Sequence, residues 1–385
     1  MKKSHPIPLA RPRLSPEDIE QAVAALHSGK LVSGEIVRQF ESRLSDYLGV
    51  KHAICVSSGT AALHLGLLAL GIGRGDEVLV PAFSFPATAN AVELTGARPI
   101  FIDSLKNEFN MDFDEIESVL SEHTRAIIIV HNFGLPARMD KIMEIAEYHE
   151  IPIFEDAACA LGSEFRGIKC GSLGKLAAFS FHPRKILTTG EGGAVVTNND
   201  FLADSIYCLR NHGLKNGTKN EFISVGFNYR MTEFQAALGY SQFSRFEMTI
   251  LNRQKTAEFY HNTIKISGLK SYRPSELDKA NYQSFVLITN DRIRDDLIAY
   301  LKSNNIEAGI GTYSIPHTEY YSRKYGFVDS DYPHSLYAYK NLISLPLFEG
   351  LLESEQEFIV SKLREYFSDN CKILASKNAV MTAAP

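Results

Sequence analysis

The sequence lacks several features that would assign it to a specialised class of protein. Its 385 residues contain no tryptophan and five cysteines, and no apolar run reaches the roughly 20 residues of a membrane span. The cysteines form no C-x-x-C pair and the 12 histidines form no H-x-x-x-H helix, so the sequence predicts no disulfide framework and no metal site. The scattered cysteines are Cys55, Cys159, Cys170, Cys208 and Cys371.

The charge balance is slightly acidic. Forty Lys and Arg residues against 45 Asp and Glu residues give a net charge of −5, which argues against a nucleic-acid partner. The amino-terminal residues carry two lysines without an apolar stretch behind them, so they do not resemble a secretory signal. With 45% hydrophobic residues the chain can bury a large core, and we expect a cytoplasmic protein without a membrane partner.

Short apolar runs alternate with helical patterns through the first half of the chain. Runs this short and apolar are typical of strands buried on both faces, and their alternation with helices predicts a mainly parallel sheet covered by helices on each side. The expected strands are 53–57, 77–81, 98–103, 126–131, 151–156, 177–182 and 193–198, and the expected helices between the earlier ones are 60–71, 87–96, 112–121 and 139–150.

The length favours more than one domain. We predict an arm at 1–15, a large domain at 16–245 that opens with helices at 16–29 and 35–49, a small α+β domain at 246–369 and a disordered tail at 370–385. A nearly continuous helix over 230–260 would bridge the two domains, and the small domain would contain a strand at 282–288 and helices at 293–305 and 353–367.

The stretch "FSFHPRKILTTGEGG" places Lys185 directly after an expected strand. A lysine there is either an ordinary surface residue or a nucleophilic amine. Its reference pKa of about 10.4 must be lowered by its surroundings before it can react near neutral pH. One such use is a Schiff base with pyridoxal 5′-phosphate (PLP), and the glycines at 190, 192 and 193 would let the backbone turn beneath the lysine.

PLP also needs a carboxylate at its pyridine nitrogen, and Asp156 is the candidate. This residue ends the expected strand "IPIFED", at the strand edge where ligands bind in sheets of this kind. As a cofactor group it would keep the ring nitrogen protonated, and Ala158 is small enough to let the ring lie close to the backbone. The alternative is that Asp156 caps a helix.

A phosphate site is indicated by "SSGTAALHL", where Ser58, Gly59 and Thr60 precede an expected helix. Backbone N–H groups, hydroxyls and the helix dipole favour a dianion at such a position, although the same residues could simply cap the helix. Ser180 could add a hydroxyl, and Phe85 could stack on the cofactor ring or belong to the core.

Taken together and in this order, these motifs resemble the DegT/DnrJ/EryC1/StrS family of PLP-dependent sugar aminotransferases, which have the type I fold of the aspartate aminotransferases. The resemblance covers about residues 8–365 and includes "SGTAALHL", "PAFSFPATANAV", "EDAACALG", "FSFHPRK" and "GFNYRMTEFQAALG". It implies an α/β fold with a large, mainly parallel sheet domain and a smaller carboxy-terminal α+β domain.

The resemblance also implies site residues. Lys185 would carry PLP, Asp156 would meet the pyridine nitrogen, and Phe85 would stack on the ring. The implied phosphate ligands are Thr60, the Ala61 amide, Ser180 and, from the neighbouring subunit of a homodimer with shared active sites, Asn228.

Three further positions follow from the same resemblance. Cys159 stands where many members have a glutamine that contacts the ring hydroxyl, and a thiol is a poorer hydrogen-bonding group. Tyr313 and His317 lie in a variable region that would face the sugar nucleotide.

The implied activity is transfer of an amino group from L-glutamate to a nucleotide-linked keto sugar, with a 4-keto-6-deoxyhexose expected. A 3-keto sugar or a cyclitol remains an alternative acceptor. Sugar 3-dehydratases of this family carry histidine in place of the lysine, so Lys185 argues against that reaction, and a non-catalytic PLP-binding protein is disfavoured by the intact site. The glycines of "LGIGRGDE" follow a helix and precede a strand, the wrong order for a nicotinamide dehydrogenase.

Overall fold

The computed structural model describes residues 6–106, 108–289 and 293–381, with side chains described as far as residue 368. The amino-terminal arm lies along the carboxy-terminal half of the chain. The Ile7 N–H donates to the Asn305 carbonyl at 2.8 Å, and the Glu307 N–H donates back to the Ile7 carbonyl at 2.9 Å. Residues that are almost 300 positions apart in the sequence therefore form one short parallel bridge.

Helices α1 (Pro16–His27) and α2 (Glu35–Leu48) begin at the predicted residues. Ser15 and Asp18 form a capping box in which each side chain accepts a hydrogen bond from the backbone N–H of the other residue. Gly49, at a φ of 68°, ends α2 in the left-handed conformation that glycine adopts without strain.

A seven-stranded sheet forms the centre of the large domain, in the order β1-β10-β9-β6-β5-β2-β4. Every neighbouring pair from β4 to β9 is parallel, and β10 runs antiparallel to both β9 and β1. The predicted mainly parallel sheet is therefore confirmed. Its strands are β1 (His52–Val56), β2 (Glu77–Pro81), β4 (Arg98–Ile102), β5 (Thr124–Val130), β6 (Ile153–Asp156), β9 (Leu176–Ser180) and β10 (Gly193–Thr197).

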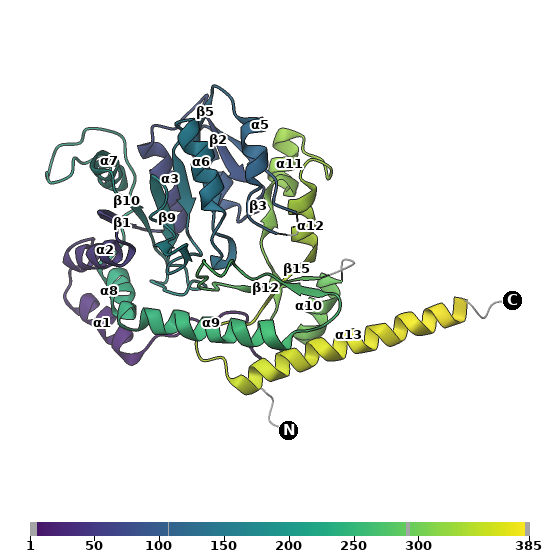
Figure 1. Cartoon of the computed structure of the whole chain (residues 1–385). Coiled ribbons are helices and arrows are strands. Elements are labelled where there is room, and N and C mark those ends of the chain that lie inside the picture. Colours follow the sequence, from purple (N-terminus) through teal and green to yellow (C-terminus); the bar gives the residue numbers. More distant parts are fainter. Residues whose placement is uncertain (1–5, 107, 290–292, 382–385) are drawn as a thin grey trace.

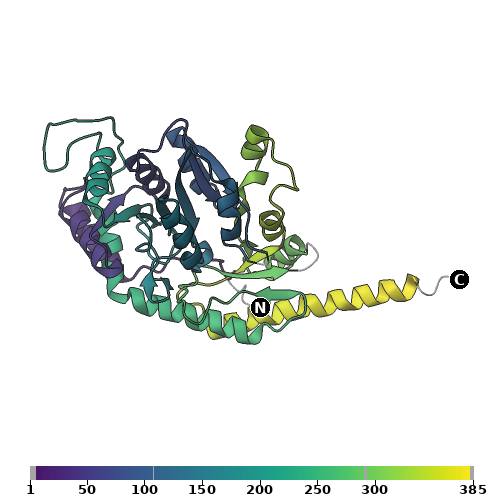
Figure 2. The same cartoon turned by 45° about the horizontal axis from the view of Figure 1, so that its top comes forward.

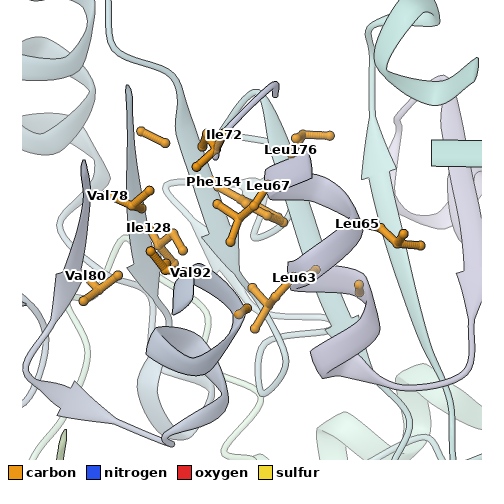
Figure 3. Close-up of a cluster of buried hydrophobic side chains, with 14 of the residues drawn as sticks. Leu63, Leu65, Leu67, Ile72, Val78, Val80, Val92, Ile128, Phe154 and Leu176 are labelled. Atoms are coloured by element: carbon orange, nitrogen blue, oxygen red, sulfur yellow. The ribbon is translucent and has the colours of Figure 1, made fainter. Parts of the chain in front are cut away.

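Helices cover both faces of this sheet because successive strand residues point to opposite sides. On one face, helices α3 (Gly59–Ala69), α4 (Ala87–Thr95) and α7 (Asp200–Arg210) pack against alternate residues such as Val78, Ile128 and Phe154 (Figure 3). The other face is covered by α2 and α6 (Met139–Tyr148), which meet the intervening residues. The strands are buried on both sides, as their apolar sequences predict.

Helix α3 lies unusually close to the sheet. A Cβ atom at Gly66 would come within 2.4 Å of the Phe154 ring, so only glycine fits at this point of the helix. Leu63 and Leu67 of the same helix face Phe154 in Figure 3. This packing fixes the position of the amino-terminal end of α3, where the phosphate site is predicted.

A second sheet, in the order β11-β12-β15-β13, belongs to the carboxy-terminal part of the chain and is antiparallel throughout. Helix α9 (Phe246–Thr263) joins the two cores, since Ile250 packs in the core of the large sheet and Tyr260 packs in the core of the small one. Strands β11 (Leu269–Ser271), β12 (Phe285–Thr289), β13 (Gly309–Ile310) and β15 (Leu342–Leu345) form the small sheet. The domain boundary at residue 245 stays a prediction.

Three helix predictions differ from the structure in their bounds or continuity. The nearly continuous helix expected over 230–260 consists of α8 (Glu233–Gln242), a 3₁₀ turn at Phe243–Arg245 and α9, which begins at the residue that follows the turn. The last helix, α13 (Glu353–Met381), continues past the predicted end at 367, and it extends away from the body in both views (Figures 1 and 2). The disordered tail expected at 370–385 stays a prediction. Residues 382–385 of the predicted tail lie outside the described residues.

The remaining elements are short. The predicted helix over 112–121 is a 3₁₀ turn at Phe113–Glu115 followed by α5 (Ile116–Val119), because the segment contributes mainly Ile116 to the core. The others are β3 (Phe83–Ser84), a 3₁₀ turn at Asn132–Gly134, β7 (Glu164–Phe165), β8 (Ile168–Lys169), α10 (Arg294–Ser303), β14 (Tyr313–Ser314), a 3₁₀ turn at Ile315–His317, α11 (Glu319–Tyr325) and α12 (Pro333–Asn341).

None of the helices in the described part of the chain has the length and apolarity needed to cross a bilayer. Cys55, Cys159, Cys170 and Cys208 are free thiols, and the Cys371 side chain lies outside the described residues. Within residues 6–106, 108–289 and 293–381, no group of three or more His, Cys, Asp or Glu side chains is arranged to hold a metal ion.

Candidate active site

Lys185 lies in a tight turn that follows β9. The Lys185 N–H donates to the His182 carbonyl at 2.8 Å, and the Thr189 N–H closes the loop on the Phe181 carbonyl at 2.9 Å. The half-buried Lys185 side chain turns towards the loop after β6, where its Nζ donates to Cys159 Sγ at 3.0 Å. This contact favours the reactive role over an ordinary surface lysine, and the role of Lys185 stays a prediction. Gly190 takes a φ of 82° in the turn, as expected for a glycine that reverses the backbone.

Asp156 ends β6 with its side chain buried, at 6% exposure. One carboxylate oxygen accepts the Thr88 hydroxyl at 2.7 Å and the other accepts the Ala158 N–H at 3.2 Å. Burial raises the pKa of Asp156, and the Thr88 hydroxyl, the Ala158 N–H and the charge of Lys185 oppose that rise. Turns rather than a helix follow Asp156, so the helix-cap alternative is wrong. The carboxylate can still accept a hydrogen bond from a cationic ring nitrogen.

The amino-terminal end of α3 is capped as predicted, and its role as a phosphate site stays a prediction. Ser58 Oγ accepts the Ala61 N–H at 3.1 Å, which is a helix cap. The N–H groups of Gly59 and Thr60 precede the first intrahelical bond, so they remain free to bind an anion. A Cβ atom at Gly59 would lie 2.8 Å from the Ser180 Cβ, which places the Ser180 hydroxyl beside this helix end.

Phe85 lies at the mouth of the site, and 63% of its surface is exposed, so the core alternative is wrong. The segment from Ser84 to Thr88 links it to the carboxylate, because Ser84 Oγ and Thr88 Oγ1 lie 3.0 Å apart and Thr88 bonds to Asp156. The Phe85 ring also meets the Tyr313 ring edge-on, with centroids 6.2 Å apart.

Tyr313 reaches the site because β14 pairs with β3, a contact between the carboxy-terminal half and the large domain. Its ring stacks on Tyr339 with centroids 6.1 Å apart. His317 follows in the 3₁₀ turn after β14. Its Nδ1 is 2.7 Å from Ser314 Oγ, and its Nε2 is buried without a hydrogen-bond partner in the described part of the chain. The structure thus brings Tyr313 beside Phe85, whereas His317 contacts Ser314 and the Tyr332 ring.

Asn228 does not join the cluster through a side-chain bond. It is exposed, pairs with Asn211 through the backbone, and its side chain has no hydrogen-bond partner among the described residues. The next residue, Tyr229, is bound to the segment between β1 and α3, because its carbonyl accepts the Ser57 N–H at 2.8 Å. Within one chain, Asn228 therefore lies near the segment that precedes α3, and its side-chain amide makes no hydrogen bond to the described residues.

These groups are of the chemical types that PLP requires, and their roles stay predictions. The buried carboxylate and the amine follow the neighbouring strands β6 and β9, the start of α3 follows β1 of the same sheet, and Phe85 is an exposed aromatic ring that follows β3. The gap between Gly59 and Ser180 is so narrow that only a glycine leaves the helix end open.

The family is decided by a family model that matches residues 12–364, described as the DegT/DnrJ/EryC1/StrS aminotransferase family. The chain belongs to this family. It is a PLP-dependent aminotransferase with the type I fold, as the resemblance implies.

Its relatives in this family include enzymes of sugar metabolism. The chain is 41% identical to the GDP-perosamine synthase of Caulobacter vibrioides over 269 residues, which cover 70% of this chain and 72% of that protein. It is 32% identical to the spore coat polysaccharide biosynthesis protein SpsC of Bacillus subtilis, covering 94% of this chain and 98% of that one. A candidate sugar aminotransferase of Streptococcus pneumoniae, Spr1654, solved in its pyridoxamine phosphate form, superposes with a TM-score of 0.91 at 26% identity, covering 97% of this chain and all of that one.

Some residues of this aminotransferase site escape sequence reasoning. Thr88 is fully buried in α4 and bonds to Asp156, and its only sequence signal is a hydroxyl within the apolar pattern "ATANAV". Asn281 and Gln283, from the carboxy-terminal half, bond to the backbone of Cys159 and Ile186, and no sequence motif predicts either contact. The contact between Cys159 and Lys185 is also new, since the resemblance predicts a cofactor contact at Cys159 and gives no bond between the two side chains.

Proposed function

We propose that this aminotransferase moves an amino group from L-glutamate to a nucleotide-linked keto sugar, a 4-keto-6-deoxyhexose, to give an amino sugar. The observation that carries the proposal is the placement of Lys185 and Asp156 at the carboxyl ends of neighbouring strands, beside an open aromatic mouth. The GDP-perosamine synthase of C. vibrioides, named for a GDP-linked product, supports a nucleotide-linked substrate.

When bound, PLP would supply an electron-withdrawing ring that stabilises negative charge at the α-carbon of the donor. The Lys185 amine would be the general base that takes the proton from this carbon and returns it on the other side of the transfer. Its 3.0 Å contact with Cys159 Sγ marks where the amine rests in the described structure. Asp156 would hold a proton at the ring nitrogen, because its buried carboxylate gains most from a cationic partner.

The two ends of the cofactor would be bound by different elements. The N–H groups at the start of α3, the Thr60 hydroxyl and the Ser180 hydroxyl would bind the phosphate, and Phe85 would cover the ring. In this arrangement the Ala61 amide acts first as the partner of Ser58 and only secondarily as a phosphate ligand.

A homodimer with shared active sites is part of the proposal. Asn228 presents an unused amide on the surface, and the loop before it projects from the body beside α7 (Figure 1). That loop exposes the apolar side chains of Phe222, Ile223 and Val225, which a second copy of the chain would cover. We place the enzyme in the cytoplasm.

A substrate panel tests the function. The protein with PLP and L-glutamate would be incubated with 4-keto-6-deoxyhexoses linked to GDP, dTDP or UDP, with 3-keto isomers and with a keto cyclitol, and 2-oxoglutarate and the new amine would be measured. We expect turnover with a nucleotide-linked 4-keto sugar and none with the Lys185→Ala variant. Turnover confined to a 3-keto sugar or a cyclitol would replace the proposed acceptor.

A further inference from the structure

A short, strained segment of the carboxy-terminal half lies against the lysine loop. It comprises Asn281, Tyr282 and Gln283 and leads into β12. Tyr282 takes a φ of 50°, in the left-handed region that an aromatic residue rarely adopts. Such a conformation persists only where surrounding contacts stabilise it, and it often accompanies a functional site.

The Gln283 side chain spans the backbone on both sides of Lys185. Its Oε1 accepts the Ile186 N–H at 3.1 Å, and its Nε2 donates to the Arg184 carbonyl at 2.6 Å. One amide therefore binds the residue before the lysine and the residue after it. This double contact fixes the direction in which the Lys185 side chain leaves the loop.

Asn281 holds the opposite loop with the same kind of group. Its Nδ2 donates to the carbonyls of Cys159 and Leu161, each at 2.9 Å, and its Oδ1 accepts the Gln283 N–H at 2.8 Å. The approach is close, since a Cβ atom at Gly134 would lie 1.8 Å from Asn281 Oδ1. The loop after Asp156 and the loop that carries Lys185 are thus tied to one three-residue segment.

Arg253 of α9 stabilises the strained backbone. Its guanidinium donates to the Tyr282 carbonyl at 3.1 and 2.8 Å and to the Gln283 carbonyl at 2.8 Å. Only 6% of Arg253 is exposed, and burial lowers its pKa to about 9, with Glu349 opposing the fall. The three hydrogen bonds to these carbonyls and the charge of Glu349 offset part of the cost of burying the cation, so Arg253 is bound tightly to the two carbonyls.

We propose that Gln283 is a positioning residue for Lys185, held in place by Arg253 and Asn281, so that the carboxy-terminal half sets the geometry of the reacting amine. The inference rests on the proposed role of Lys185. Small displacements of a reacting group cost large factors in rate, so the removal of the two Gln283 bonds should slow proton transfer more than it weakens binding.

The test compares Gln283→Leu and Gln283→Glu with the matched control Gln254→Leu. Gln254 of α9 also bonds to this region, through its Nε2 to the Ala280 carbonyl at 2.8 Å, but it does not touch residues 184–186. Each variant would be loaded with PLP and reduced with borohydride, and the labelled lysine would be identified by mass spectrometry. We would then measure the rate and KM of the L-glutamate half-reaction, the pH midpoint of the PLP absorbance and the midpoint of thermal unfolding.

We expect Gln283→Leu to slow the half-reaction by about 10- to 100-fold, with KM changed less than about threefold and the absorbance midpoint shifted. Gln283→Glu keeps the acceptor for Ile186 but sets a carboxylate oxygen against the Arg184 carbonyl, so its rate should also fall below that of wild type. Gln254→Leu should match wild type. Where Gln283→Leu is too unstable to compare, the polar Gln283→Glu variant of equal length decides.

Two results overturn the inference in distinguishable ways. If wild type is labelled at Lys185 and the Gln283 variants match Gln254→Leu in rate, KM and absorbance midpoint, the positioning role is wrong and the proposed function stands. If wild type is labelled at another lysine or not at all, the role of Lys185 is wrong and the inference falls with it.

Discussion

The floor and the mouth of the site differ in how the chain holds them. The floor comprises Asp156, Lys185 and the start of α3, whose side chains are tied by hydrogen bonds within one chain. The mouth comprises Phe85 and Tyr313, which are exposed and meet other residues mainly through ring contacts and backbone pairing. The floor is suited to one chemistry, whereas the mouth is open to a substrate and, in the proposed homodimer, to a second subunit.

The floor therefore determines the type of reaction, and the mouth determines which substrates bind. A buried carboxylate and an amine at strand ends have few uses, and the family match agrees with the one proposed. Exposed aromatic rings accept many flat or partly apolar ligands, so the mouth favours a class of substrate without selecting one member. Changes in the floor should therefore abolish chemistry, and changes in the mouth should alter binding.

The largest effect is expected from Lys185→Arg. Arginine keeps the positive charge but stays protonated and cannot act as nucleophile or base, so amino transfer should fall by at least about 10³-fold. Lys175→Arg, at an exposed position just before β9, is the matched control and should retain full activity. Steady-state turnover measures both, and appreciable transfer by Lys185→Arg would place the chemistry elsewhere.

The second largest effect is expected at Asn228 and tests whether two subunits share each active site. Asn228→Asp should weaken PLP binding by about 10-fold or more, because it places a carboxylate against the cofactor phosphate. If the sites are shared, mixing inactive Lys185→Arg subunits with Asn228→Asp subunits rebuilds one intact site in each mixed dimer. Random reassociation should then return about a quarter of wild-type activity. No recovery on mixing, with mixed dimers verified, would show that each site belongs to one chain.

A smaller effect is expected from Tyr313→Phe. Loss of the hydroxyl should raise the KM for the keto sugar by about three- to tenfold and leave the L-glutamate half-reaction unchanged, because the ring still packs on Phe85 and Tyr339. Tyr320→Phe, an exposed tyrosine on α11, serves as the control. An equal loss in both half-reactions would assign Tyr313 to the floor.

The smallest effect concerns stability without PLP. Burial raises the pKa of Asp156 above its ordinary value of 3.8, so the folded protein holds this proton more tightly than the unfolded chain. The resulting stability is fully present below pH 3.8 and is lost as the pH rises through the raised pKa. Asp156→Asn stays neutral, so its melting temperature should exceed that of the PLP-free wild type by a few degrees near pH 7. A constant difference from pH 4 to 8 in thermal unfolding would contradict this.

The parts of the floor that sequence reasoning predicts are those that local patterns define. Lys185 and Asp156 each follow an apolar strand, and the start of α3 carries a capping motif. Contacts made by folding are different: Gln283 lies 97 residues from Ile186, and an isolated glutamine before a strand has no distinctive pattern. The break between α8 and α9 has the same cause, since no proline or glycine occurs at Phe243–Arg245 to announce it.

The absorbance spectrum of the purified protein with PLP, before and after L-glutamate, tests the central claim most directly. The account predicts a band from PLP bound to Lys185 that moves to the pyridoxamine phosphate position when L-glutamate is added, and that is missing in Lys185→Ala. A band that persists in Lys185→Ala, or one that L-glutamate leaves unmoved in wild type, would contradict the assignment of Lys185 as the reacting lysine or of L-glutamate as the donor.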